Sequence, residues 1–133
     1  MSIASALHEL TNEPYRVCIS DAGGGQSCWK GIALTRWLND PVEDAHGFFI
    51  YLRDADTGAL WSAGLQPTAR APDRYEVQRA LKHFVIERED FGITSVMSVS
   101  VQDDVEVRRL RLCNRSNQVR RIEVTSYLEI ALV

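Results

Sequence analysis

The sequence lacks the features that bring a protein to a membrane or to nucleic acid. No apolar run in its 133 residues approaches the roughly 18 residues needed to span a bilayer. Residues 1–10 also lack the basic-then-apolar pattern of a signal peptide. The net charge is −3, and the arginines of residues 108–111 and 120–121 stand among apolar or acidic residues, as on solvated strands. We therefore expect a cytoplasmic protein that binds neither membranes nor nucleic acid.

Cysteine is scarce, which excludes a disulfide framework and the common metal sites. The three cysteines are Cys18, Cys28 and Cys113. An odd number of widely spaced cysteines fits reduced thiols. Together with the three histidines they form no C-x₂-C or H-x₃-H spacing. We expect no metal and no cofactor, and we interpret Cys18 as a small apolar residue of a buried strand.

Two phosphate-binding motifs are also absent, although the chain has a cluster of three glycines, Gly23–Gly25. A P-loop needs Gly-Lys-Ser/Thr at the start of a helix, and the cluster continues instead as Gln-Ser-Cys. The dinucleotide motif needs a third glycine where Cys28 stands. The cluster is therefore either a wide turn between two strands or a loop that contacts a ligand or partner, with Trp29 and Trp37 nearby.

The composition is that of a soluble globular domain, with 45% hydrophobic and 25% charged residues. A chain of this length buries one core. No internal repeat or linker divides it, so we expect residues 1–133 to form a single domain.

Most of the chain has the period-two pattern of β-strands. The clearest case runs from Ile122 to Leu132, where even-numbered apolar residues alternate with polar ones. Val105–Cys113 precedes it across a polar turn, so we predict that these two segments form a hairpin.

Further strands are expected upstream: the first two form a hairpin, and the last leads into Val105–Cys113 as a meander. They are Phe48–Arg53, Leu60–Trp61, Tyr75–Gln78, His83–Glu89 and Ile93–Val101. Only Ile3–Leu10 and Ala33–Leu38 are compatible with short helical turns. Many short strands joined by turns predict an all-β antiparallel β-sandwich.

Several conspicuous side chains have structural interpretations. Trp61 is expected in the core, because large aromatic side chains dominate β-cores. The aspartate pairs 54/56 and 103/104 stand at hairpin turns, where aspartate makes local hydrogen bonds. Arg74 and Glu76 are expected to form cross-strand ion pairs.

Several ordered motifs carry a resemblance to a known family. They are Ala22–Gly25, Thr35–Trp37, Phe49–Asp54, Trp61–Gly64, Gln66-Pro67, Pro72–Val77, Glu106–Arg109 and Glu123–Tyr127. From Tyr15 onward the chain resembles the N-terminal β-supersandwich of glycoside hydrolase family 94, formerly glycosyltransferase family 36. Within that family, the pattern is most similar to the phosphorylase-like region of cyclic β-1,2-glucan synthases.

The resemblance implies a role beside a catalytic domain. Family members join the supersandwich to an (α/α)₆ barrel, whose carboxylic acid protonates the glycosidic oxygen while inorganic phosphate attacks with inversion. No residue of this chain matches that acid, so we expect the isolated chain neither to catalyse phosphorolysis nor to use phosphate. The family's supersandwich is about twice as long, which predicts that this domain is its first half.

The resemblance also suggests contacts with sugar. The candidate residues are Gly24, Gly25, Gln26, Ser27, Trp29, Arg36 and Trp37, with residues 26–29 expected at the tip of a glycine-rich loop. In the family this loop typically reads Gly-Tyr-Ser-Arg-Trp, and here Gln26 and Cys28 replace the tyrosine and the arginine. The expected partners are a β-glucan or oligosaccharide, the barrel, and further copies of the chain through the even-numbered face of 122–132. The alternative is a structural or oligomerisation module that binds no sugar.

Overall fold

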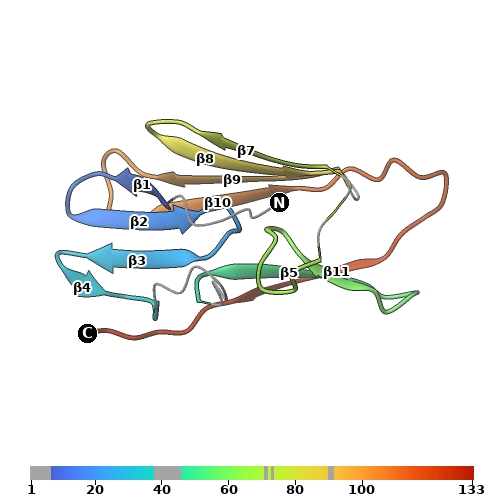
Figure 1. The fold of residues 1–133 in the computed structure, drawn as a ribbon, viewed down its shortest axis with the longest axis horizontal. Helices are drawn as coiled ribbons and strands as arrows, with labels where there is room; N and C mark the ends of the chain where they lie inside the picture. The colour runs from blue at the N-terminus through green and yellow to red at the C-terminus, as the bar shows by residue number, and fades with distance from the viewer. Residues whose placement is uncertain (1–6, 38–45, 71, 73, 90–91) are drawn as a thin grey trace.

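The computed structural model describes residues 7–37, 46–70, 72, 74–89 and 92–133 (Figure 1). These residues form eleven antiparallel strands and no α-helix, which confirms the expected all-β fold. The strands are β1 (Leu7–Thr11), β2 (Tyr15–Ser20), β3 (Gly25–Trp29), β4 (Ile32–Ala33), β5 (Phe49–Asp54), β6 (Leu60–Ser62), β7 (Tyr75–Arg79), β8 (His83–Arg88), β9 (Ile93–Val99), β10 (Glu106–Arg111) and β11 (Ile122–Tyr127).

The strands form three sheets, of which the first two pack face to face. The first sheet has the order β1-β2-β3-β4 and the second β10-β9-β8-β7. Alternate residues of each strand point into the space between the two sheets. The resulting core consists of Leu10, Tyr15, Val17 and Ile19 from the first sheet and Phe84, Ile86 and Met97 from the second.

The third sheet, β11-β5-β6, extends the first sheet sideways into one composite layer (Figure 1). The C-terminal residues make this junction, because Ala131 N donates to Leu34 O at 3.0 Å and Val133 N donates to Ala33 O at 3.1 Å. The inner face of the third sheet meets the second sheet in another core, formed by Leu52, Trp61, Ala63 and Ile93. The expected burial of Trp61 is confirmed.

The predicted β5–β6 hairpin and the predicted pairing of β9 with β10 are present, and the predicted strands β7 and β8 pair with each other. The predicted hairpin between Val105–Cys113 and the C-terminal segment is wrong, since β10 pairs with β9 and β11 pairs with β5. The connection between β10 and β11 carries the chain into the other layer. There Arg120 forms an ion pair with buried Asp54 at 3.0 Å, which fixes the approach of β11 to the end of β5.

Both predicted helical turns are also wrong where the structure describes them. In Ile3–Leu10, residues 7–10 belong to β1, whose Leu10 is buried against the first core; residues 3–6 lie outside the described residues. In Ala33–Leu38, Ala33 ends β4 and Thr35 bridges to Ile130, whereas residue 38 is not described. In both segments strand pairing satisfies the backbone and overrides a weak local helical pattern.

Candidate functional site

The glycine cluster lies where three turns meet backbone to backbone. Gly25 N donates to His46 O at 2.9 Å, and Gln66 N donates to Ala22 O at 2.9 Å. A Cβ on Gly25 would lie 1.9 Å from Cys18 O, and one on Gly64 would lie 2.8 Å from Ala22 O. The glycines are therefore needed for close packing. We call this contact of residues 21–25, 46–48 and 62–66 the three-turn junction.

A buried arginine holds one of these turns in place. Arg88 of β8 is enclosed between the layers and donates to Ser62 O at 2.6 Å, Gly64 O at 2.7 Å and Arg70 O at 2.7 Å. Its planar fork of N–H donors suits several carbonyl acceptors at once. The second sheet thereby anchors the turn that packs on the glycine cluster.

The residues predicted to contact sugar do not gather at one loop tip. Gly24 and Gly25 are buried in the three-turn junction, whereas Gln26–Trp29 belong to strand β3. Ser27 is buried and faces the second sheet, where it donates to Glu106, while half-buried Gln26 alternates to the opposite face. The expectation that residues 26–29 form the loop tip is therefore wrong.

The two tryptophans and Arg36 lie farther along the first sheet. The Trp29 indole donates to Asp104 Oδ2 at 2.6 Å, and Lys30 lies 4.6 Å from its ring centroid. Arg36 is exposed and forms a 2.9 Å ion pair with Glu129, and Trp37 is half-buried. Trp29 thus ties the β9–β10 turn to the first sheet, and Arg36 lies on the outer face of the composite layer.

A polar cluster between the first two sheets was not among the predicted site residues. Glu106 accepts hydrogen bonds from Ser27 at 2.5 Å, from Tyr15 at 3.0 Å and from Arg108 at 3.0 Å. The sequence signal for it is the pair Glu106 and Arg108, two residues apart on one face of a strand. Arg108 also donates a hydrogen bond to the backbone carbonyl of Phe48 at 3.1 Å. The Phe48 ring centroid lies 4.6 Å from the Arg108 guanidinium.

The environment of this cluster keeps its carboxylate ionised. Burial opposes ionisation, but Arg108 and the Ser27 hydroxyl outweigh it and lower the pKa of Glu106. Burial, with the adjacent Glu106 carboxylate, raises the pKa of Tyr15 to about 12. Tyr15 is therefore a neutral donor to a charged acceptor at neutral pH.

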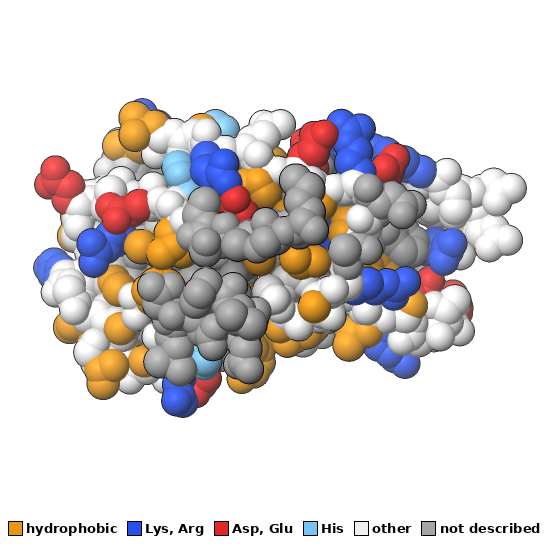
Figure 2. Space-filling model, in the orientation of Figure 1, with side chains coloured by type: hydrophobic (Ala, Val, Ile, Leu, Met, Phe, Trp, Pro, Cys, Tyr) orange, Lys and Arg blue, Asp and Glu red, His pale blue; other side chains and the backbone are white. Residues whose placement is uncertain are grey.

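The cluster forms one wall of an open groove with a volume of about 410 Å³. Its polar side comes from Tyr15, Ser27, Glu106 and Arg108, and its apolar side includes Leu34, Leu128, Ile130 and Leu132. Figure 2 shows hydrophobic side chains along the lower left of the molecule, where Figure 1 draws β4 and the C-terminal segment. The groove is thus apolar along Leu34 and residues 128–132 of the composite layer, and polar where β2 and β3 face β10.

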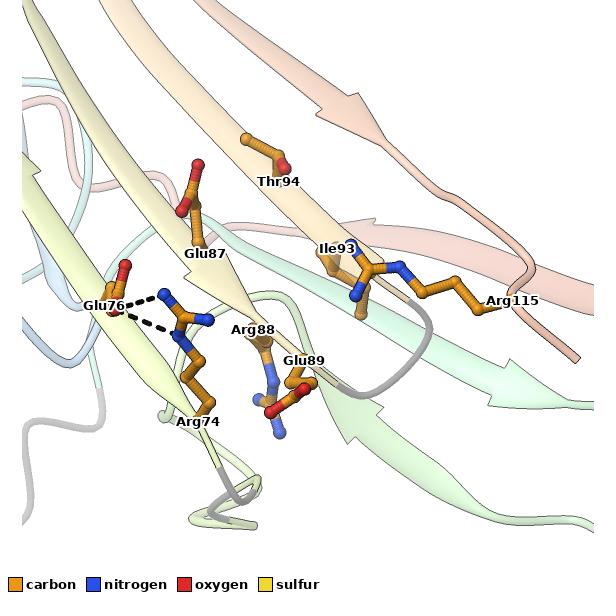
Figure 3. A pocket seen from close by; sticks show the side chains of 9 residues that line it. Arg74, Glu76, Glu87, Arg88, Glu89, Ile93, Thr94 and Arg115 are labelled. Atoms are coloured by element: carbon orange, nitrogen blue, oxygen red, sulfur yellow. Dashed lines mark hydrogen bonds and ion pairs between the residues drawn. The ribbon is translucent and has the colours of Figure 1, made fainter.

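A second hollow, of about 160 Å³, lies at one end of the second sheet and is highly charged (Figure 3). Arg74 donates to Glu76 Oε1 from Nε at 3.0 Å and from Nη2 at 2.8 Å. Arg74 and Glu76 were expected to form ion pairs across strands. They instead pair with each other, two residues apart in the chain. Glu87 and Arg115 also line this hollow.

The described part of the chain offers no metal centre. No three of its His, Cys, Asp and Glu side chains gather as metal ligands, and the three cysteines are unpaired. None of its segments is a helix long and apolar enough to cross a membrane.

Comparison with known proteins places the chain in a family. Residues 3–133 match the model of the supersandwich domain of glycosyl hydrolase 94. The chain is 41% identical over 130 residues to the cyclic β-(1,2)-glucan synthase NdvB of Rhizobium meliloti (strain 1021), covering 92% of this chain and 4% of that protein. It is 31% identical over 129 residues to the N,N'-diacetylchitobiose phosphorylase of Vibrio furnissii, covering 92% of this chain and 16% of that enzyme.

A third relative matches a shorter stretch. The solabiose phosphorylase of Paenibacillus borealis is 36% identical over 86 residues, which cover 63% of this chain and 11% of that enzyme. The chain thus spans less than a fifth of the length of each of these curated relatives. The family match covers nearly all of the chain. The chain belongs to the glycosyl hydrolase 94 supersandwich family.

Proposed function

We propose that this domain is the non-catalytic, carbohydrate-associated sandwich of a glycoside phosphorylase or a cyclic β-1,2-glucan synthase-like protein. In this role it packs against an (α/α)₆ catalytic barrel and lends residues to the sugar-binding cleft. Support comes from the family match and from the names of the relatives, a cyclic β-(1,2)-glucan synthase and two phosphorylases.

No residue of this chain matches the family's catalytic acid, and the environment of two inward-facing carboxylates supports the non-catalytic part of the proposal. A general acid at a glycosidic bond needs a raised pKa. Here the Ser27 and Arg108 side chains contribute to a lowered pKa of Glu106. The backbone amides of Thr57 and Asp56 likewise lower the pKa of Asp54. Both carboxylates are hydrogen-bonded acceptors, which suits structural roles.

The sugar contact is testable on the outer face of the composite layer. Two exposed ion pairs lie there with the same chemistry, Arg36–Glu129 at 2.9 Å and Arg53–Glu123 at 2.8 Å. Arg36 belongs to the predicted contact set and Arg53 does not. Replacing either by alanine removes one exposed ion pair of small energetic value.

The experiment is a titration of isotope-labelled chain with sophoro- and cello-oligosaccharides, followed by NMR. We expect shifts at Gln26, Arg36 and Trp37 that are lost in Arg36→Ala and kept in Arg53→Ala. Equal loss in both variants, or no shift with millimolar sugar, would leave the alternative of a structural or oligomerisation module. Sugar 1-phosphate released by the chain alone would contradict the non-catalytic assignment.

A further inference from the structure

The charged hollow at one end of the second sheet lies on the outer face of that sheet (Figure 3). Ile86 and Arg88 of β8 are buried between the layers, so Glu87 points to the opposite side of the sheet. Glu87 is the register partner of Glu76 on β7 and of Thr94 on β9. The three side chains therefore form one row across the strands, and all three line the hollow.

One side of the hollow carries an excess of negative charge. Like charges directly opposite each other on neighbouring strands repel, and Glu76 and Glu87 are such a pair. Arg74 forms an ion pair with Glu76, and the carboxylates of Glu76, Glu89 and Glu87 together raise the pKa of Arg74. The Arg88 guanidinium is turned inward to backbone carbonyls. Three carboxylates thus share one outward guanidinium, and a further positive charge would be stabilised beside them.

The other side of the hollow presents a guanidinium that faces no carboxylate of its own. Figure 3 shows Arg115 reaching from the β10–β11 connection to the start of β9, opposite Arg74. A Cβ on Gly92 would lie 3.1 Å from Arg115 Nε and 3.4 Å from its Cζ, so the glycine leaves the space that the guanidinium fills. Within the described residues, neither Arg115 nor the Thr94 hydroxyl has a hydrogen-bond or ion-pair partner. Both donors are therefore available to an anionic group.

The hollow thus has a negative and a positive side, and its volume of about 160 Å³ suits a small molecule. We propose that it binds a small zwitterion in which a short carbon chain separates an ammonium group from a carboxylate. The ammonium lies between Glu87 and Glu89, and the carboxylate accepts hydrogen bonds from Arg115 and Thr94. Hydrogen bonds between ionised groups are the strong ones, and the planar fork of a guanidinium matches a carboxylate.

Occupants of a single charge fit the hollow less well. A simple anion would meet the carboxylates of Glu87 and Glu89, and a simple cation would meet the Arg115 guanidinium. A metal ion needs several converging ligands, and no three His, Cys, Asp or Glu side chains of the described residues gather in this way. The hollow lies on the second sheet, whereas Arg36 belongs to the composite layer, so its occupancy is independent of the proposed sugar contact.

The test is an NMR titration of the isotope-labelled chain with amino acids of increasing chain length: glycine, β-alanine, γ-aminobutyrate and δ-aminovalerate. We expect saturable shifts at Glu87, Thr94 and Arg115 that are largest for one member of the series, because the two charged sides are a fixed distance apart. Butylamine and butyrate each carry only one of the two charges and should bind at least ~10-fold more weakly. Equal binding of either compound, or no shift with any member at millimolar concentration, would overturn the proposal.

Matched variants separate the hollow from a general effect of charge. Arg115→Ala and Glu87→Gln each remove one of the two contacts and should weaken binding at least ~10-fold. Arg121→Ala removes an exposed arginine of the same connection that pairs with Asp56 outside the hollow, and it should leave the affinity unchanged. None of the three side chains is buried, so the variants keep the fold and its circular dichroism. Unchanged affinity in Arg115→Ala or Glu87→Gln, or an equal loss in Arg121→Ala, would overturn the proposal.

Discussion

Leu52 and Val124 are cross-strand neighbours on the same face of the third sheet, yet their environments differ completely. Leu52 packs with Trp61 and Ile93 against the second sheet and is fully buried, whereas half of Val124 is exposed. Both belong to strands with the same alternation of apolar and polar residues. The alternation sets which way a side chain points, and the opposite layer determines whether it is buried.

The largest expected difference is between two alanine substitutions at this pair. Leu52→Ala removes a fully buried side chain and lowers the free energy of unfolding by about 2–5 kcal/mol. Val124→Ala costs about 1 kcal/mol or less, since the side chain is half exposed. Urea denaturation of the two variants measures both losses. Similar losses at the two positions would show that the single chain already covers Val124.

The fold was largely predictable because strand period and turn chemistry are local signals. The β5–β6 and β9–β10 hairpins follow from short polar turns between alternating segments. The partner of β11 was not predictable in this way, because the connection 112–121 crosses between layers and the pairing with β5 depends on the buried Asp54–Arg120 ion pair. The exposure of Val124, Leu128 and Ile130 likewise depends on where the opposite sheet ends.

A smaller difference is expected between two glycines, one in the three-turn junction and one in an open turn. Gly25→Ala forces a Cβ to within 1.9 Å of the Cys18 carbonyl oxygen, which no rotamer change relieves; we expect a loss of roughly 3 kcal/mol. At Gly58 no atom lies within 4 Å of an added Cβ and φ is +74°. Gly58→Ala therefore costs only about 1 kcal/mol of backbone strain. Thermal unfolding followed by circular dichroism compares the two variants. Equal unfolding midpoints for Gly25→Ala and Gly58→Ala would contradict close packing at the three-turn junction.

The candidate site was less predictable than the fold. The glycine cluster is visible in the sequence, but the turns that meet it come from residues 46–48 and 62–66, and only the fold brings them together. The alternation of β3 sends Ser27 inward and Gln26 outward, so one motif serves two faces of the sheet. Glu106 was not among the predicted site residues, because its donors Tyr15 and Ser27 are distant in the sequence.

The smallest effect we predict concerns Glu106, which lies on the polar side of the groove between β10 and the C-terminal segment. Its pKa in the folded chain is lower than in the unfolded chain. The folded state therefore binds fewer protons, and the stabilisation is complete above the unfolded pKa and is lost as the pH falls through the folded one. Glu106→Gln should remove this acid dependence and lower the stability at neutral pH by about 1–3 kcal/mol. Urea denaturation at a series of pH values measures both.

Tyr15→Phe is the matched control, because it removes one donor and leaves the carboxylate in place. The pKa of the Tyr15 phenol rises from 10.0 to about 12 on folding. Its stabilisation is therefore complete below pH 10.0 and is lost as the pH rises through about 12. Tyr15→Phe should flatten the alkaline limb of the stability profile and keep the acid limb that Glu106→Gln removes. If the loss of stability at acid pH survives in Glu106→Gln, it arises from other carboxylates, such as Asp54. The contact between β3 and β10 would then depend on packing rather than on the charge of Glu106.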